Sequence, residues 1–238
     1  MENDLRKEAR AEASQRVSDD DVGLRQYVRR IYNYMAGGLA LTGAVAYLCA
    51  STGFYGSIAG TPLFWVVLLA PLALVMFLSF RIEHISLGAA QTSFWAYAAL
   101  VGLSLSGIFL VYTGESIARV FFISAATFGA TSLYGYSTRA DLSRFGSFLF
   151  MGLIGIIIVG LVNLFMVSSA LQFVVSMIGV LVFTGLTAYD MQRIKRIYMA
   201  GEEGESAGKK AIMGALALYL DFLNLFLMLM RLFGSRRN

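Results

Sequence analysis

Long apolar stretches separated by short polar turns run along this chain from residue 31 almost to its C-terminus. A helix needs roughly 20 apolar residues to cross the hydrocarbon core of a bilayer, which is about 30 Å thick. Seven stretches have about that length: 31–51, 62–80, 88–112, 117–136, 145–167, 171–190 and 211–233. The pattern therefore predicts an all-α, polytopic membrane protein with one seven-helix transmembrane domain, residues 31–238.

The segment before the first apolar stretch has a different character. Residues 1–30 hold seven basic and seven acidic side chains and lack the apolar core of a signal peptide. Ser18 precedes three aspartates, which is typical of a helix N-cap followed by an acidic first turn. We expect a polar cytosolic tail, residues 1–30, with a short amphipathic helix at the membrane surface.

Composition agrees with a membrane protein and excludes several other classes. The chain is 58% hydrophobic and 14% charged, with a mean hydropathy of +0.68, whereas soluble domains are about a quarter charged. Its net charge of +4 lies in loops and tails, with no basic stripe for nucleic acid. Because Cys49 and His84 are the only residues of their types, no intrachain disulfide, zinc site or other cofactor is expected.

Basic residues alternate between successive loops, which predicts the orientation of the chain. They lie in the N-terminal tail and after the second, fourth and sixth stretches: Arg81, Arg139, Arg144, Arg193, Lys195, Arg196, Lys209 and Lys210. This pattern places the N-terminus in the cytosol. Seven spans would then put the C-terminus outside, although Arg231, Arg236 and Arg237 follow the last stretch, so a re-entrant last segment is the alternative.

Two carboxylates interrupt the apolar pattern. Of the 15 acidic residues, only Asp190 and Asp221 lie within the apolar stretches. An ionised aspartate at a helix centre costs about 3 kcal/mol on insertion scales, so a buried carboxylate is a candidate functional group. The midpoint of positions 190 and 221 is 205.5, inside the polar turn between the last two stretches, so an antiparallel hairpin would place the pair at one depth.

The chemistry of such a pair leaves several roles open. On the last helix, Asp221 shares a face with Gly214, Ala217 and Asn224, a small and polar stripe that favours contact with other helices. Two carboxylates in a poor dielectric do not readily both ionise, so they share a proton and titrate together. The pair could sense pH, bind a cation, catalyse acid–base chemistry, or only hold two helices together.

Arg81 is the candidate partner for this pair. It ends the second stretch on the cytosolic side, where its guanidinium could hold one carboxylate with two hydrogen bonds. The alternative is an arginine that extends to the membrane surface and marks orientation only.

Four segments together resemble the Bax inhibitor-1 family of transmembrane proteins, in its bacterial branch. They are LRQYVRRIYNYMAGGLALTGAVAY, SLYGYSTRADLSRFGSFLFMGLIGIIIVGLVNLF, VLVFTGLTAYDMQRI and GALALYLDFLNLFLMLMRLFG. The resemblance implies a bundle in which six helices surround the last. It also implies a pH-sensitive calcium leak across the bacterial inner membrane, with Asp190 and Asp221 as the ion-binding and pH-sensing pair and Arg81 as a gating latch. The second stretch lacks the glutamate that some family members carry.

Two other functions remain open at this stage. Bacterial relatives are linked to modulation of a membrane AAA protease, so the charged tail could dock such a partner. Paired intramembrane aspartates also occur in aspartyl proteases, but the Gly-x-Gly-Asp motif of that class is replaced here by Leu-Tyr-Leu-Asp. We therefore expect a leak channel with no catalytic residues, whose partners are lipid, calcium ions and protons.

Overall fold

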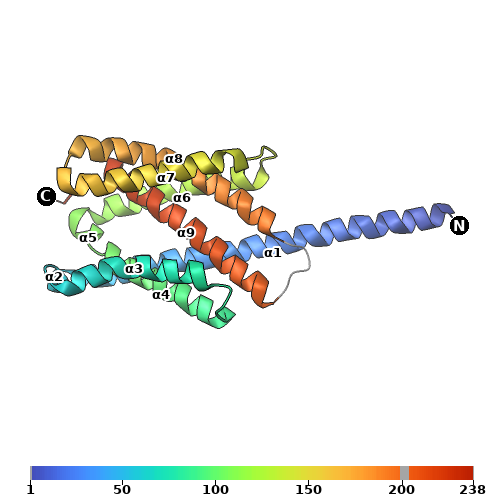
Figure 1. Cartoon of the computed structure of the whole chain (residues 1–238), viewed down its shortest axis with the longest axis horizontal. Coiled ribbons are helices and arrows are strands. Elements are labelled where there is room, and N and C mark those ends of the chain that lie inside the picture. The colour runs from blue at the N-terminus through green and yellow to red at the C-terminus, as the bar shows by residue number, and fades with distance from the viewer. Residues whose placement is uncertain (1, 199–203, 238) are drawn as a thin grey trace.

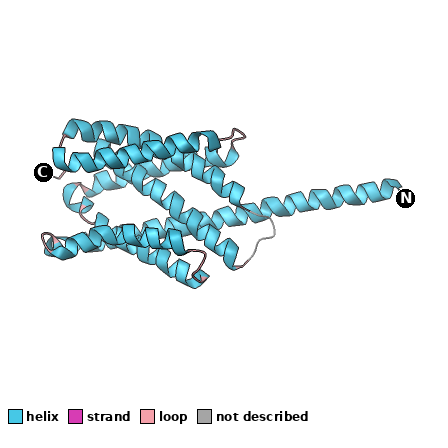
Figure 2. Ribbon diagram, viewed as in Figure 1, coloured by secondary structure: helices cyan, strands magenta, loops and turns pink. Residues whose placement is uncertain are grey.

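The computed structural model describes residues 2–198 and 204–237, with side chains from residue 22 onward. All regular secondary structure in these ranges is helical (Figure 2). The helices are α1 Glu2–Ser51, α2 Phe54–Ile58, α3 Pro62–Arg81, α4 Leu87–Leu105, α5 Ile108–Val111, α6 Gly114–Ser137, α7 Ser143–Met166, α8 Ser169–Ile197 and α9 Glu205–Phe233.

Seven candidate membrane spans emerge once α4 and α5 are joined into one stretch, Leu87–Val111. Their exposed surfaces carry large apolar side chains, as a surface in contact with lipid requires. The prediction of an all-α bundle with seven spanning helices is confirmed.

The last helix lies at the centre of the bundle. In its most apolar window 72% of the residues are buried, against 39% in α8 and 0% in α7. It packs against α1, α4, α6 and α8, while α3 packs on α4 and α7 packs on α8 from outside. Figure 1 shows α9 crossing between a group formed by α6, α7 and α8 and a group formed by α1, α3 and α4.

The last segment crosses the whole bundle. Its first residue, Glu205, accepts a hydrogen bond from the Leu87 backbone at the start of α4. Past its other end, Ser235 accepts a hydrogen bond from the Thr113 backbone at the start of α6. With 29 residues, α9 is about 44 Å long, enough for a bilayer core of about 30 Å. A re-entrant last segment does not fit this geometry.

The N-terminal region differs from expectation. We predicted a short separate helix beginning near Ser18, but α1 is continuous from Glu2 to Ser51 (Figure 1). Residues 2–30 contain no proline and are rich in Ala, Glu, Arg and Lys, which favour helix. The helix of the first span therefore extends back through this segment, and Ser18 lies inside it.

Candidate functional site

The structure brings Asp190 and Asp221 together. Asp190 lies near the end of α8 and Asp221 at the middle of α9, and their carboxyl groups lie within hydrogen-bonding reach of each other. The Asp221 side chain is 5% exposed, and its Oδ2 has no hydrogen-bond partner among the described residues. A hydrogen bond between two carboxyl groups requires a proton on one of them, so the geometry is that of a pair sharing a proton.

Small residues allow α8 and α9 to approach closely on both sides of this pair. A Cβ atom added at Gly179 of α8 would lie 2.8 Å from Met228 Cγ of α9. On the other side, a Cβ atom at Gly214 of α9 would lie 3.3 Å from Ile194 Cγ1 of α8. Close backbone approach at small residues is how helices associate in lipid, so the sequence itself fixes the contact between the two carboxyls.

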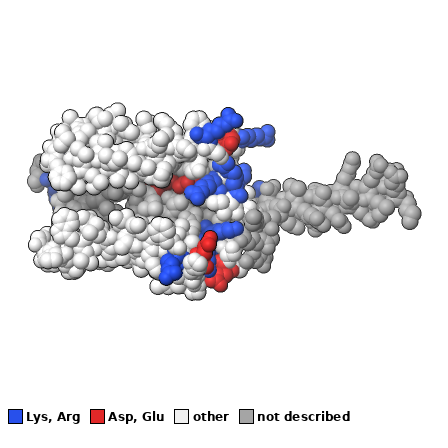
Figure 3. All heavy atoms as spheres, in the orientation of Figure 1, with Lys and Arg blue, Asp and Glu red and all other residues white. Residues whose placement is uncertain are grey.

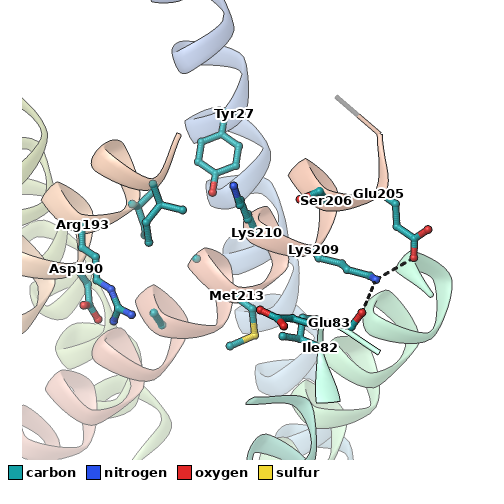
Figure 4. Close-up of a pocket in the computed structure, with 14 residues that line it drawn as sticks. Tyr27, Ile82, Glu83, Asp190, Arg193, Glu205, Ser206, Lys209, Lys210 and Met213 are labelled. Atoms are coloured by element: carbon teal, nitrogen blue, oxygen red, sulfur yellow. Dashed lines mark hydrogen bonds and ion pairs between the residues drawn. The ribbon is translucent and has the colours of Figure 1, made fainter. Parts of the chain in front are cut away.

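A cavity of about 670 Å³ leads toward the pair from the charged end of the bundle (Figure 4). Asp190 lies in its wall, and Ala217, one helical turn before Asp221, also lines it. Figure 3 shows that the acidic and basic side chains in view gather mainly at this end, while most of the visible surface of the bundle lacks charged side chains. Ions that enter from the solution at that end would therefore reach Asp190 before Asp221.

The mouth of the cavity is held together by Lys209 of α9. Its Nζ lies 3.0 Å from Glu205 Oε1 and donates to the Glu83 backbone oxygen at 3.4 Å. Glu205 Oε1 also accepts from the Leu87 backbone at 3.1 Å. These contacts fasten the first turn of α9 to the turn between α3 and α4.

The cation beside the pair is Arg193, one turn after Asp190 on α8 (Figure 4). The spacing i, i+3 places the two side chains on one face of the helix. This contact could therefore have been predicted from the sequence. In the sequence, Arg193 was interpreted only as one of the basic loop residues that predict orientation. Arg81 ends α3 as an exposed side chain, and its neighbours Ile82 and Glu83 line the cavity. Its latch role stays a prediction.

Asn224, the supporting polar residue on the face of Asp221, is half-buried. Its Nδ2 donates to the Leu220 backbone oxygen of its own helix at 2.9 Å. One N–H group of the Asn224 side chain is therefore satisfied within α9. The role of Asn224 in the site also stays a prediction.

Beyond the pair, away from the charged end, aromatic side chains fill the bundle. Phe222 follows Asp221 directly, and its ring centre lies 5.4 Å from that of Phe121 and 5.6 Å from that of Phe128. Phe226, one turn further along α9, lies 6.3 Å from Phe121. This cluster is apolar and offers an ion no polar ligands of its own.

The end of α8 that carries Asp190 is fixed to the turn between α6 and α7. Buried Gln192 accepts from the Leu142 backbone at 2.9 Å and donates to the Ala140 oxygen at 2.8 Å. In the same turn, hydrogen bonds from Ser143, assisted by the Arg196 charge, hold the pKa of Asp141 below its ordinary value. These contacts limit the movement of α8 at this end.

A resident metal centre is not indicated. Within the described residues, no group of three or more His, Cys, Asp or Glu side chains could hold a metal ion. Two carboxylates supply the oxygen ligands that calcium prefers, but far fewer than its usual six to eight, so water would complete the shell.

Fold and site together define a polytopic membrane protein with a carboxyl pair on its central helix and the helix beside it. The profile of the family described as "Inhibitor of apoptosis-promoting Bax1" matches residues 24–238. The chain belongs to this Bax inhibitor-1 family, as the sequence motifs predicted.

Several bacterial relatives are similar along nearly their whole length. The uncharacterized protein RP147 of Rickettsia prowazekii is 49% identical, over 92% of this chain and 93% of its own. The inner membrane protein YbhL of Escherichia coli K12 is 47% identical, over 90% of this chain and 94% of its own. An uncharacterized protein of Caulobacter vibrioides is 42% identical, over 91% of each chain.

Proposed function

We propose that this protein is a pH-sensitive cation leak channel that transports calcium and holds no resident cofactor. The single observation that carries the proposal is the close pair Asp190–Asp221, buried within the spans and reached by a cavity from the charged end. A buried pair of carboxyls is costly in lipid, and attraction of a cation or a proton offsets that cost.

The proposed mechanism has two states. In the closed state the two carboxyls share a proton, and the phenylalanine cluster blocks the far side of Asp221. A change in the protonation of the pair alters the attraction between α8 and α9 and biases the bundle toward a second arrangement. Asp190 and Asp221 are the ligands that a passing cation meets, and Arg193 tunes the charge at Asp190.

Ion-specific flux into proteoliposomes tests this function. We expect calcium entry well above that of protein-free vesicles, and a smaller response for potassium at equal driving force, because paired carboxylates favour a divalent ion. The vesicles are loaded with a calcium-sensitive or a potassium-sensitive dye and compared at several pH values. If neither ion enters faster than into protein-free vesicles at any pH, the channel proposal is wrong.

The membrane and orientation follow as part of the proposal. The relative YbhL is named as an inner membrane protein, and we infer the same membrane for this chain. The charged end seen in Figure 3 would face the cytosol under the positive-inside rule, with the N-terminus on that side.

A second candidate is an interaction protein that modulates a membrane AAA protease. The observation that favours it is the N-terminal part of α1, which projects past the bundle (Figure 1). Crosslinking in cells, with the full chain and with residues 1–21 removed, tests this role. A partner captured equally by both forms would rule out the tail as its docking element.

A further inference from the structure

One face of the central helix is only partly covered by other helices. Between Ala211 and Met230 every residue of α9 is buried except five that are only partly buried: Met213, Ala217, Leu220, Asn224 and Leu227. Their spacing of four, three, four and three residues places them on a single face. The packing of α9 against α1, α4, α6 and α8 accounts for its other faces.

The cavity near Asp190 begins at this face. Met213 and Ala217 line it together with Ile82 and Glu83, which follow α3, and with side chains of α8. Figure 3 shows a hollow along the molecule between the two groups of helices that flank α9. The cavity therefore lies between helices, and two residues of the partly buried α9 face, Met213 and Ala217, form part of its wall.

The lining of the cavity combines charged and apolar side chains. Among the charged ones are Arg193, Lys209, Glu83 and Glu205, and among the apolar ones are Ile194, Met213 and Ala217. Lys209 uses two of its three N–H donors on Glu205 and Glu83. Arg193 has an exposed side chain that reaches the same space.

We propose that this cavity binds one phospholipid molecule from the surrounding leaflet. Its phosphodiester group would lie at Arg193, and one acyl chain would lie along Met213, Ala217 and Leu220. A guanidinium matches phosphate geometry with two hydrogen bonds, and an apolar helix face within a bilayer needs an apolar cover. The bound lipid would cover the approach to Asp190, but its binding does not depend on ion transport.

Photocrosslinking of the full chain in proteoliposomes tests the proposal directly. The probe is a phospholipid with a diazirine in one acyl chain, and labelled residues are mapped by peptide mass spectrometry. We expect labels on Met213, Ala217 and Leu220 of α9, besides labels on exposed α7 residues such as Phe148, which contact bulk lipid. The buried opposite face of α9 serves as an internal negative control.

Two comparisons separate a specific site from bulk lipid. Arg193→Gln should lower α9 labelling about tenfold, the worth of one charge-assisted hydrogen bond, and leave α7 labelling unchanged. Lys195→Gln is the matched control, because Lys195 is on the same helix but donates to the Tyr136 oxygen of α6. A diacylglycerol probe of equal chain length should label α7 but not α9 in the parent protein.

The proposal is overturned by any of three results. These are an unlabelled α9 face in the parent, equal labelling of α9 by the diacylglycerol probe, or α9 labelling that is the same in Arg193→Gln and Lys195→Gln. The diacylglycerol comparison uses the parent protein alone, so it decides the matter even where a variant folds poorly.

Discussion

Asp221 shows how far a single residue can be interpreted from sequence. A carboxylate in an apolar stretch is costly, and its spacing from Asp190 predicted that both would meet across a hairpin. The structure has this contact. The sequence also contained several arginines near the charged end, and spacing alone did not decide which of them faces the pair. Arg193 lies there because it is one turn from Asp190 on the same helix, whereas Arg81 points out from the end of α3.

Buried hydroxyl groups of single residues were not predicted at all. Thr42 of α1 contacts the Tyr219 hydroxyl of α9 at 2.6 Å and donates to the Ala98 oxygen of α4 at 2.8 Å. Threonine and tyrosine within a span can face lipid, protein or a cavity, so their partners depend on tertiary packing.

Thr42 and Tyr219 yield a prediction at this scale. Tyr219→Phe should lower the free energy of unfolding by about 0.6 kcal/mol, the average worth of a hydrogen bond between membrane helices. Thr42→Val should cost about 1–2 kcal/mol, because it leaves both the Tyr219 hydroxyl and the Ala98 oxygen without this partner. Unfolding in detergent measures both values. A Tyr219→Phe variant less stable than Thr42→Val would contradict this account of the contact.

At the scale of elements, hydropathy located all seven spans but not all of their ends. The sixth and seventh stretches were expected to end at residue 190 and to begin at residue 211, yet α8 continues to Ile197 and α9 begins at Glu205. The added turns are polar, so hydropathy cannot detect them. They are stabilised by specific contacts, such as the Lys209–Glu205 pair and the hydrogen bonds of Gln192.

Helix packing at glycine gives a second prediction. A Cβ atom added at Gly135 of α6 would lie 2.8 Å from the Ala188 Cα atom of α8, so this contact requires glycine. Gly135→Ala should therefore push α6 and α8 apart and cost about 1–3 kcal/mol. The matched control is Gly129→Ala on the same helix, where the added atom meets nothing within 4 Å.

Thermal unfolding of the two alanine variants in detergent checks this prediction. The Gly135 variant should unfold at a clearly lower temperature than the parent, and the Gly129 variant at the same temperature or slightly above it, since alanine favours helix. Equal unfolding temperatures for both variants would show that α6 and α8 can separate without cost.

At the scale of the whole molecule, the family resemblance predicted the central position of α9, which residue patterns alone did not establish. The structure explains that position by packing, because α9 has helices on most of its faces and α7 on few of its own. The distribution of charge predicts the orientation of the molecule in the membrane. The turns after α3 and α6 and the C-terminal end of α8 are at the basic end, where a cytosolic face is expected (Figures 1 and 3).

Cysteine labelling tests this orientation. In a Cys49→Ala background, we expect Ser169→Cys, at the start of α8, to react with a membrane-impermeant maleimide on intact cells. Arg139→Cys, in the turn between α6 and α7, should react only after permeabilisation. The reverse pattern would place the N-terminus outside and contradict the positive-inside assignment.

The central claim is that Asp190 and Asp221 act as one titrating unit that controls the cation leak. It is tested most directly by calcium flux into proteoliposomes over a pH series, for the parent, Asp190→Asn, Asp221→Asn and the control Asp141→Asn, whose carboxyl is exposed in the α6–α7 turn. The account predicts a parent flux that changes by up to about tenfold per pH unit, a change kept in the control and lost in both pair variants. An unchanged pH response in both Asp190→Asn and Asp221→Asn would contradict it.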